Sequence, residues 1–324
     1  MASGNGPGSG AERLNIAVVG VGPVGSILAA WLAKAGHHVG VVDIDEPHIA
    51  AIRKDGLHVE GMREAHGKPA EAVLKCAELG ARRWDFVAVS TKASILHTVM
   101  PDAALLAGKE GYVVSVQNGL DTEQELAAVE GPDRTLRMIV NYAGGKVAAG
   151  RIKMMFFNGH NAVGTMTPQG EAAARRFAAL VDAAGLETDY TDNVRKFEWE
   201  KTILNAAMSP LCALTDLTMR ECFESPKMNA LSKALLVEGI AVAKADGYEW
   251  EPGFLDHCVT YLSKAGHHRA SMWVDVSNKR PTEIRFLNGR IADVGDQRGV
   301  PAPLHRTIST LIEGIEQSWA SPHR

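Results

Sequence analysis

The stretch IAVVGVGPVG, residues 16–25, decides the fold, because an apolar strand runs directly into the pattern G-x-G-x-x-G. A helix-like segment follows over residues 26–36, and a second apolar run over residues 39–43 ends in an acid, Asp43. Strand, glycine loop, helix, strand and acid in this order are typical of a βαβ unit that binds a dinucleotide. The loop residues that we expect to contact the cofactor are Gly20, Val21, Gly22, Pro23, Val24 and Gly25.

Each glycine of this loop has its own physical reason. We expect Gly20 to permit the tight turn, Gly22 to let a pyrophosphate approach the backbone, and Gly25 to let helix and strand pack closely. The N-terminus of the following helix offers free N–H groups and the positive end of its dipole to the phosphates. An ordinary glycine-rich turn is the alternative interpretation, and the flanking strands, helix and acid argue against it.

Composition and charge exclude several classes of function. With 324 residues the chain has room for two domains, since roughly 100 to 200 residues make one. The net charge of −4 gives no electrostatic reason to bind nucleic acid or an acidic membrane. No apolar run reaches the roughly 18 residues of a membrane span. We therefore expect a small-molecule substrate and no nucleic-acid or membrane partner.

The termini and the cysteines bear on localisation. Residues 1–13 are expected to be a disordered tail, because their Gly/Ser-rich start lacks the apolar core of a signal peptide. The four cysteines show no C-x-x-C pair, which fits a reducing, cytoplasmic location better than a disulfide scaffold. The histidine pairs at 37–38 and 267–268 lack partners at ligand spacing, so no metal site is expected.

Further strands with polar residues at their ends follow the first unit. Apolar runs over residues 84–90 and 111–117 are followed by Lys92 and Asn118, and alternation with helical patterns predicts a doubly wound parallel sheet. Ligands bind at the carboxyl edge of such sheets, where both residues would lie. Residues 134–166 are expected to add antiparallel strands to this sheet. From about residue 194 the pattern is helical, so we predict a dinucleotide-binding domain over residues 14–192 and a helical domain over residues 193–324.

The start of the helical domain carries a candidate proton donor. Lys201 and Asn205 are four residues apart and share a helix face, which Ser209 continues. Burial in an interdomain cleft would lower the pKa of a lysine and suit it to acid–base work near neutral pH. Spacing alone leaves a solvated helix face open as the alternative.

A later segment offers polar groups of less certain meaning. Ser271 and Asp275 share a helix face, and Thr282 is suited to cap a helix that begins at Glu283. The acid is then explained equally well by the helix dipole, so spacing does not distinguish a functional Glu283 from a helix-start acid.

Taken together, residues 15–316 resemble ketopantoate reductases (2-dehydropantoate 2-reductases). The resemblance implies a Rossmann-type domain followed by an all-helical domain of the 6-phosphogluconate dehydrogenase C-terminal type. It also implies hydride transfer between a nicotinamide and a ketone carbon, with Lys201 as general acid. The segments that carry it are the glycine loop, the strand ending in Lys92, Gln117-Asn118-Gly119, Trp199-x-Lys201-x-x-x-Asn205, Ser271-Met272 with Asp275, and Thr282-Glu283-Ile284 followed by Asn288-Gly289.

The same resemblance assigns further site residues. It implies that Asn205 and Ser271 hold the substrate, and that Lys92, Asn118 and Glu283 surround the nicotinamide, its ribose and the substrate, with Glu283 in the catalytic group. Ser209, Met219 and His268 stand where the family has asparagines, and we expect Ser209 and His268 to line the substrate site. A site built to hydrogen-bond one substrate rejects its analogues strongly. The predicted substrate is therefore a 2-oxo acid or related secondary alcohol rather than ketopantoate.

Other functions remain as alternatives. A genuine 2-dehydropantoate 2-reductase is one, and a non-catalytic dinucleotide sensor is another, although retention of both Lys201 and Asn205 counts against the sensor. A β-hydroxyacid dehydrogenase also places lysine and asparagine four apart on a helix, but the Thr282-Glu283-Ile284 element argues against that family.

The acid after the second strand bears on the cofactor. Asp43 lies 18 residues after Gly25, near the spacing at which an acid binds the ribose hydroxyls of NAD. A carboxylate there would repel a 2′-phosphate, and Arg53 and Lys54 are too far along the chain to offset it. We predict NAD in preference to NADP, although ketopantoate reductases typically use NADPH. A homodimer is expected from the large helical domain.

Overall fold

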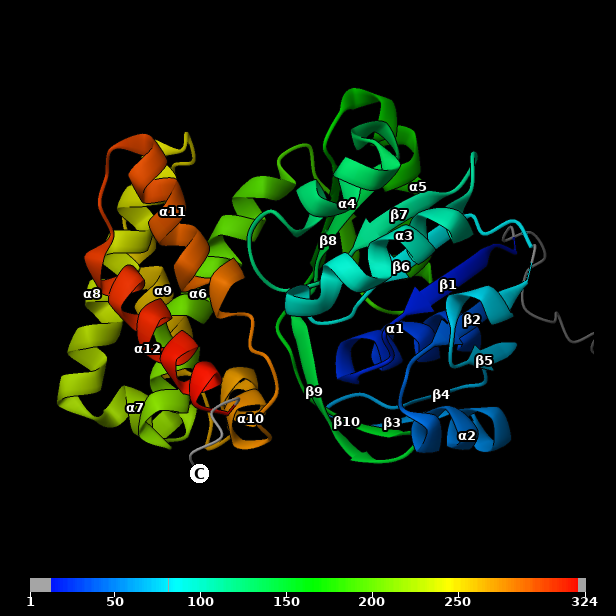
Figure 1. The fold of residues 1–324 in the computed structure, drawn as a ribbon, viewed down its shortest axis with the longest axis horizontal. Helices are drawn as coiled ribbons and strands as arrows, with labels where there is room; N and C mark the ends of the chain where they lie inside the picture. The colour runs from blue at the N-terminus through cyan, green and yellow to red at the C-terminus, as the bar shows by residue number, and fades with distance from the viewer. Residues whose placement is uncertain (1–12, 81, 320–324) are drawn as a thin grey trace, which may run out of the picture.

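Short apolar runs form an eight-stranded sheet in the N-terminal half of the chain (Figure 1). Its strands are β1 (Asn15–Val19), β2 (His38–Val42), β5 (Glu71–Val73), β6 (Phe86–Val89), β7 (Tyr112–Ser115), β8 (Thr135–Ile139), β11 (Asn161–Thr165) and β12 (Thr188–Tyr190). The order is β12-β11-β8-β7-β6-β1-β2-β5. The strands from β8 to β5 run parallel, and β11 pairs antiparallel with β8. The computed structural model describes residues 13–80 and 82–319, so the predicted tail lies outside them except for Arg13.

Helices cover both faces of this sheet, as a doubly wound arrangement requires. The helices of this half are α1 (Pro23–Lys34), α2 (Glu46–Asp55), α3 (Leu96–Ala107), α4 (Thr122–Glu130) and α5 (Glu171–Ala183). Side chains of α1 and α5 share one core with Phe86, while those of α3 and α4 share another with Val87 on the opposite face. The central strands are therefore buried on both sides, which explains their continuous apolar sequences. The predicted Rossmann-type fold is confirmed.

A second, four-stranded sheet corrects one prediction. The strands β9 (Tyr142–Ala148) and β10 (Arg151–Phe157) do not extend the main sheet; they join β3 (Leu57–Gly61) and β4 (Ala65–Gly67) in the order β4-β3-β10-β9. The edge of β8 is already occupied by β11. The helix α1 is buried along residues 25–32, and the small sheet packs on it. A helix that is apolar on all sides needs cover on its outer face as well, and this sheet provides it.

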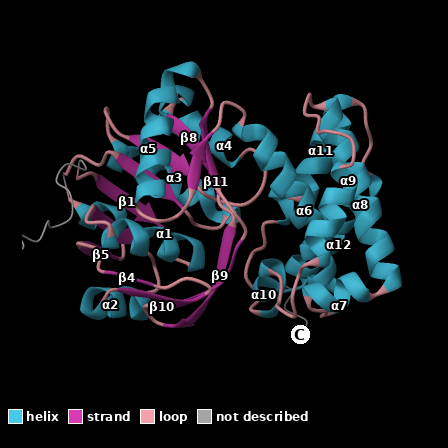
Figure 2. Ribbon diagram, turned by 180° about the vertical axis from the view of Figure 1, so that it is seen from behind, coloured by secondary structure: helices cyan, strands magenta, loops and turns pink. Residues whose placement is uncertain are grey.

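The second half of the chain is helical, as predicted, and Figure 2 draws the part beyond β12 as helices and loops alone. Its helices are α6 (Val194–Thr215), α7 (Met219–Glu224), α8 (Pro226–Ala245), α9 (Phe254–Ser263), α10 (Ser271–Ser277), α11 (Asn288–Arg298) and α12 (Pro303–Trp319). The long helix α6 contacts β8 and β11 as well as α8 and α10. It therefore connects the two halves, and Lys201 lies on it at their junction.

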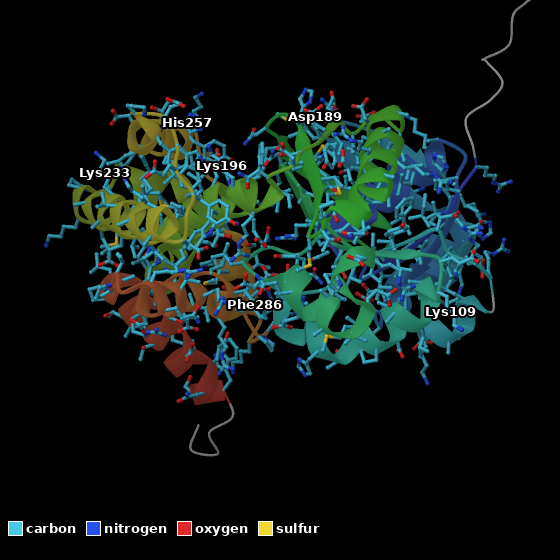
Figure 3. All side chains as sticks on the ribbon, turned by 90° about the horizontal axis from the view of Figure 1, so that it is seen from above. Lys109, Asp189, Lys196, Lys233, His257 and Phe286 are labelled. Atoms are coloured by element: carbon cyan, nitrogen blue, oxygen red, sulfur yellow. The ribbon has the colours of Figure 1, made fainter. Side chains whose placement is uncertain are left out.

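The predicted helix beginning at Glu283 is wrong. The segment Ile284–Phe286 forms a 3₁₀ turn instead, and α11 begins at Asn288. The Phe286 carbonyl accepts a hydrogen bond from the Leu120 N–H at 2.9 Å, and a Cβ on Gly119 would lie 2.5 Å from Phe286 Cβ. The 3₁₀ turn thus packs against the turn after β7, and this contact fixes its backbone in a conformation other than an α-helix. Phe286 lies at the junction of the halves in Figure 3, far from Lys109 and Lys233 at their outer ends.

Some properties concern the described residues as a whole. No helix within residues 13–80 and 82–319 is long and apolar enough to cross a membrane. In that same part of the chain, no three His, Cys, Asp or Glu side chains are grouped so that they could hold a metal ion. All four cysteines are buried and unpaired.

A buried arginine on β8 joins the sheet to the helical half. Arg137 is 2% exposed, and its guanidinium donates to the carbonyls of Gln117 at 2.8 Å and Gly119 at 3.0 Å. Its Nε donates to Glu198 Oε1 on α6 at 3.0 Å and lies 3.5 Å from Glu123 Oε2 on α4. One side chain thus holds both sides of the Asn118 turn and the first turns of α6.

Further ion pairs extend this cluster. Arg195 Nη1 lies 2.7 Å from the second oxygen of Glu198 and also pairs with Asp121, which in turn pairs with Arg290 of α11. Burial and the nearby Glu198 carboxylate raise the pKa of Glu123 to about 8. The cluster links α4, α6 and α11 through charges that are largely removed from water.

The cluster predicts a strong effect of Arg137→Met on stability. The substitution keeps much of the side-chain volume but removes the donor from Glu198 Oε1 and from the flanking carbonyls, and Arg195 still pairs with the other oxygen of Glu198. We expect a loss of about 3–5 kcal/mol in the free energy of unfolding, measured by urea denaturation. Arg151→Met is the control, because Arg151 pairs with Glu60 at an exposed site and should cost at most about 1 kcal/mol. Equal losses of unfolding free energy in the two variants would contradict the role of Arg137 in joining the sheet to the helical half.

Candidate active site

The glycine loop between β1 and α1 has the geometry that a dinucleotide requires. Gly20 has φ +88°, and a Cβ there would lie 2.7 Å from the Thr91 backbone nitrogen. A Cβ on Gly25 would lie 2.1 Å from the Gly20 carbonyl oxygen. A Cβ on Gly22 would meet no atom within 4 Å. The fold therefore needs two of the glycines, whereas the third faces open space beside the N-terminus of α1, as a bound pyrophosphate would require.

Three side chains hold the backbone of Val21 in this loop: those of Asp43, His48 and Ser26, whose Oγ donates to the Val21 carbonyl at 2.6 Å. Asp43 at the end of β2 accepts the Val21 N–H at 2.8 Å with Oδ2 and the Asp45 N–H at 3.0 Å with Oδ1. The buried His48 of α2 accepts the Gly150 N–H on Nδ1 at 2.9 Å, so its Nε2–H donates to the Val21 carbonyl, also at 2.9 Å. Sequence reasoning missed His48, because its partners are 27 and 102 residues away and leave no local pattern.

A lysine that sequence analysis did not single out lies beside the loop. Lys146 of β9 forms an ion pair with Asp45, which also accepts the His48 N–H and so caps α2. The Lys146 charge is therefore already paired at the end of β2 where an adenosine ribose would bind.

Three charged side chains meet across the junction of the two halves. Lys92 Nζ, just beyond β6, lies 2.6 Å from Asp275 Oδ2 of α10 and 3.7 Å from Glu283 Oε2. Burial alone would lower the pKa of Lys92, but the two carboxylates outweigh it and raise that pKa. Burial raises the pKa of Asp275 to about 6, with Lys92 opposing.

Glu283 also contacts backbone and side chain of the sheet edge. Its Oε1 accepts the Ala93 N–H at 3.3 Å, and its Oε2 lies 3.5 Å from Asn118 Nδ2. The predicted residues Lys92, Asn118 and Glu283 therefore lie together, at the carboxyl edge that the sequence indicated.

Lys201 lies on the side of α6 that faces the sheet. Its Nζ donates to the Val140 carbonyl, just past β8, at 2.6 Å. Burial lowers the pKa of Lys201 to about 7; the charge on Arg137 lowers it further, and Glu283 offsets part of the effect. A lysine in this environment exchanges its proton near neutral pH, so the alternative of a solvated helix face is wrong for Lys201.

The remaining predicted residues lie around this group without a polar contact to it. Asn205 and the buried Ser209 follow Lys201 along α6, and Ser271 begins α10, which packs on α6. Within the described part of the chain, no side-chain hydrogen bond joins any of the three to Lys201 or Glu283. Ser271 is exposed.

An aromatic residue of the small sheet approaches the predicted substrate residue His268. The ring of Phe156 on β10 lies 6.4 Å from that of His268, centroid to centroid. Burial lowers the pKa of His268, which keeps the imidazole neutral at physiological pH. Sequence reasoning missed Phe156, because it comes from the hairpin that was assigned to the wrong sheet.

Comparison with known proteins supplies the family context. The family models "Ketopantoate reductase PanE/ApbA" and "Ketopantoate reductase PanE/ApbA C terminal" match residues 16–168 and 193–316. The 2-dehydropantoate 2-reductase of Streptococcus pyogenes serotype M3 is 30% identical over 301 residues, which cover 92% of this chain and 97% of the relative.

Two solved structures share the whole architecture. One is the ternary structure of D-mandelate dehydrogenase with NADH and anilino(oxo)acetate, at 25% identity and a TM-score of 0.84, covering 94% of this chain and 99% of that one. The other is a PanE/ApbA family ketopantoate reductase from Ralstonia eutropha, also at 25% identity and a TM-score of 0.84, covering 95% and 100%.

The loop geometry predicts opposite effects for two glycine substitutions. Gly22→Ala should leave the melting temperature unchanged, because its Cβ meets open space, but should weaken NADH binding by roughly tenfold or more by displacing the phosphates. Gly25→Ala should lower the melting temperature by several degrees, because its Cβ overlaps a backbone carbonyl. Thermal unfolding and NADH fluorescence titration measure the two effects. Unchanged NADH affinity in a folded Gly22→Ala variant would exclude this loop as the phosphate site.

Proposed function

The chain belongs to the ketopantoate reductase family of NAD(P)-dependent oxidoreductases, and we propose that it transfers a hydride between NAD and a 2-oxo acid or related secondary alcohol other than ketopantoate. The observation that carries this proposal is the environment of Lys201. It is a half-buried lysine beside the carboxyl edge of the sheet, whose Nζ donates to the Val140 carbonyl at 2.6 Å; desolvation lowers its pKa to about 7, and the carboxylate of Glu283 offsets part of that effect. We propose the division at residues 192 and 193 as the boundary between a cofactor domain and a substrate domain.

In the proposed mechanism Lys201 holds and moves the proton. When bound, the nicotinamide supplies or accepts the hydride. In reduction the Lys201 ammonium gives its proton to the oxygen of the substrate as negative charge develops there; in oxidation the neutral amine takes that proton back. Glu283 raises the pKa of Lys201 and so helps to keep the proton available. The Val140 carbonyl accepts a hydrogen bond from Nζ and so fixes the orientation of the Lys201 side chain.

The other site residues would bind and orient. Asn118 and Lys92 are assigned to the nicotinamide, its ribose and the substrate, with Asp275 and Glu283 fixing the position of the Lys92 ammonium. Asn205, Ser209, Ser271 and His268 are assigned to the substrate. Within residues 13–80 and 82–319 no hydrogen bond involves the Asn205 side chain, one helical turn after Lys201. This supports the role, because the amide keeps donors and an acceptor available for a ligand.

The identity of the substrate rests on the family positions that differ. A hydroxyl at Ser209, a thioether at Met219 and a neutral imidazole at His268 replace amides, and Phe156 lies beside His268. Such a pocket favours a less polar substituent on the 2-oxo acid. The likeness to D-mandelate dehydrogenase supports an NADH-dependent reaction on a 2-oxo or 2-hydroxy acid. Genuine 2-dehydropantoate 2-reductase activity, the name of the streptococcal relative, is the second candidate.

The preference for NAD is proposed from Asp43 and Lys146. Asp43 is held at the end of β2 by two backbone N–H groups, and each of its oxygens keeps a lone pair for a ribose hydroxyl. A 2′-phosphate would meet this carboxylate, and the nearby Lys146 is already paired with Asp45. A homodimer and a cytoplasmic location stay predictions from the sequence.

A substrate panel with a lysine variant tests the proposed activity. Pyruvate, branched 2-oxo acids, phenylglyoxylate and ketopantoate are mixed with NADH or NADPH, and cofactor oxidation is followed by absorbance. We expect turnover of a 2-oxo acid other than ketopantoate. Lys201→Ala should lower kcat by roughly 10²–10⁴-fold with NADH affinity nearly unchanged, as expected for loss of a general acid. NADH binding without carbonyl-dependent oxidation would favour the sensor, and ketopantoate as the best substrate would favour the second candidate.

The pKa of Lys201 also fixes the direction of the pH dependence. Because reduction needs the ammonium, kcat for reduction should fall as pH rises through about 7. Because oxidation needs the neutral amine, kcat for oxidation should rise through the same range. A midpoint near the ordinary lysine value of 10.5 would contradict the buried environment assigned to this amine.

Cofactor preference is tested at residues 43 and 44. The variant Asp43→Asn with Ile44→Arg removes the carboxylate charge and adds a cation at a position that is 88% exposed, so the fold should tolerate it. We expect the ratio of kcat/KM for NADPH over NADH to rise by about tenfold or more, since arginine pairs with a phosphate by charge-assisted hydrogen bonds. Asp43→Asn with Ile44→Gln controls for the lost carboxylate. A wild-type protein that already prefers NADPH would refute the assignment of Asp43.

A further inference from the structure

The helix that carries Lys201 contains a proline in its interior. Pro210 lies within α6, and because proline has no N–H, the carbonyl of Ala206 loses the partner that residue 210 would otherwise provide. Ala206 is fully buried, so water does not replace that partner. A buried carbonyl without a donor destabilises the fold, and some other group must satisfy it.

The missing donor comes from Asn288, the first residue of α11. Asn288 is fully buried, and its Nδ2 donates to the Ala206 carbonyl at 3.0 Å. The same nitrogen donates to Nδ1 of His305 at 3.1 Å, and the Nε2–H of His305 donates to the Leu235 carbonyl at 2.9 Å. Burial lowers the pKa of His305 to about 4, so the ring stays neutral and keeps this tautomer. One continuous chain of hydrogen bonds thus joins α8, α12, α11 and α6.

The orientation of the Asn288 amide follows from its partners. The Ala206 carbonyl can only accept, and the Nδ1 atom of His305 must accept because Nε2 carries the proton. Turning the amide over would place Oδ1 against two acceptors. The amide therefore has one allowed orientation, which fixes the start of α11 against the proline site in α6.

This contact bears on the candidate active site from two directions. Ala206 follows Asn205 directly and lies five residues after Lys201 on α6. Asn288 lies five residues after Glu283, and the intervening 3₁₀ turn is docked on the Asn118 turn. The hydrogen bond therefore ties the helix that carries the lysine to the segment that carries the carboxylate.

We propose that Asn288 is a positioning residue that replaces the donor lost at Pro210 and so fixes the Lys201–Asn205 face of α6 against the Glu283 segment. Its effect on hydride transfer rests on the proposed function. Its effect on the pairing of Ala206 and on the environment of Lys201 does not.

A double-mutant cycle tests the pairing without a substrate. Pro210→Ala supplies an N–H at residue 210 that can bond the Ala206 carbonyl. Asn288→Ala should therefore lower the melting temperature by several degrees in the wild-type background and by clearly less in the Pro210→Ala background. Asn288→Leu, which is close in size, carries no charge and offers no donor, should behave in the same way if Asn288→Ala fails to fold.

Asn229→Ala is the matched control for this cycle. Asn229 also donates from Nδ2 to a backbone carbonyl of the helical half, that of Phe223 at 2.9 Å, but has no relation to Pro210. Its loss in melting temperature should be the same in both backgrounds. Additive effects of the Asn288 and Pro210 substitutions would overturn the proposed pairing.

The titration of Lys201 distinguishes positioning from simple stabilisation. The rate at which trinitrobenzenesulfonate labels Lys201, followed by peptide mass spectrometry across pH, should have its midpoint near 7 in the wild-type protein. In folded Asn288→Ala or Asn288→Leu the midpoint should rise by about one pH unit, because water reaches a loosened helix and burial is the main cause of the low pKa. Pro210→Ala combined with either variant should restore it.

The outcomes separate this proposal from the proposed function. A lower melting temperature with an unchanged Lys201 midpoint would mean that Asn288 only stabilises the fold, and the positioning role would fall. Failure of every carbonyl substrate in the panel would refute the proposed activity and leave both measurements of Asn288 valid.

Discussion

The structure depends on one buried cation at the junction of its two halves. Arg137 binds the carbonyls on both sides of Asn118 and the carboxylate of Glu198 on α6, so the sheet edge and the lysine helix share one fixed point. Charges in such a place cost desolvation energy, and the site compensates by giving the guanidinium several acceptors. Lys201 lies three residues after Glu198. The position of the candidate proton donor is thus set by an interaction that it does not itself make.

The two lysines of the site show how environment separates roles. Lys92 faces Asp275 and Glu283, and these carboxylates keep it charged. Lys201 donates to a neutral carbonyl and lies within the field of Arg137, so its pKa falls toward neutrality. In the proposed mechanism, one residue type would therefore provide a permanent charge for binding and an exchangeable proton for chemistry. Glu283 acts on both lysines, because its charge raises the pKa of Lys92 and that of Lys201.

Local sequence patterns were enough to predict the fold, but they did not predict the long-range contacts that stabilise it. The glycine loop, the alternation of strands and helices and the helical second half were predicted because each depends on neighbouring residues, and the family resemblance is confirmed. The partner sheet of β9 and β10 was not predicted, since alternation indicates a strand but not its neighbour. Arg137 and His48 were missed for the same reason, because their partners are distant in sequence. The roles of the site residues stay predictions.

The anchoring of α6 bears on how such a site can change its substrate. Arg137 fixes the helix before Lys201 through Glu198, and Asn288 satisfies its backbone at Ala206, beside the proline. Asn205 and Ser209 lie on α6 on either side of Ala206. Within residues 13–80 and 82–319, no hydrogen bond involves either side chain. In the proposed substrate site, their replacement would therefore change the polarity without moving the lysine. A helix held through its backbone and one buried carboxylate can keep its proton chemistry while the residues that contact the substrate vary.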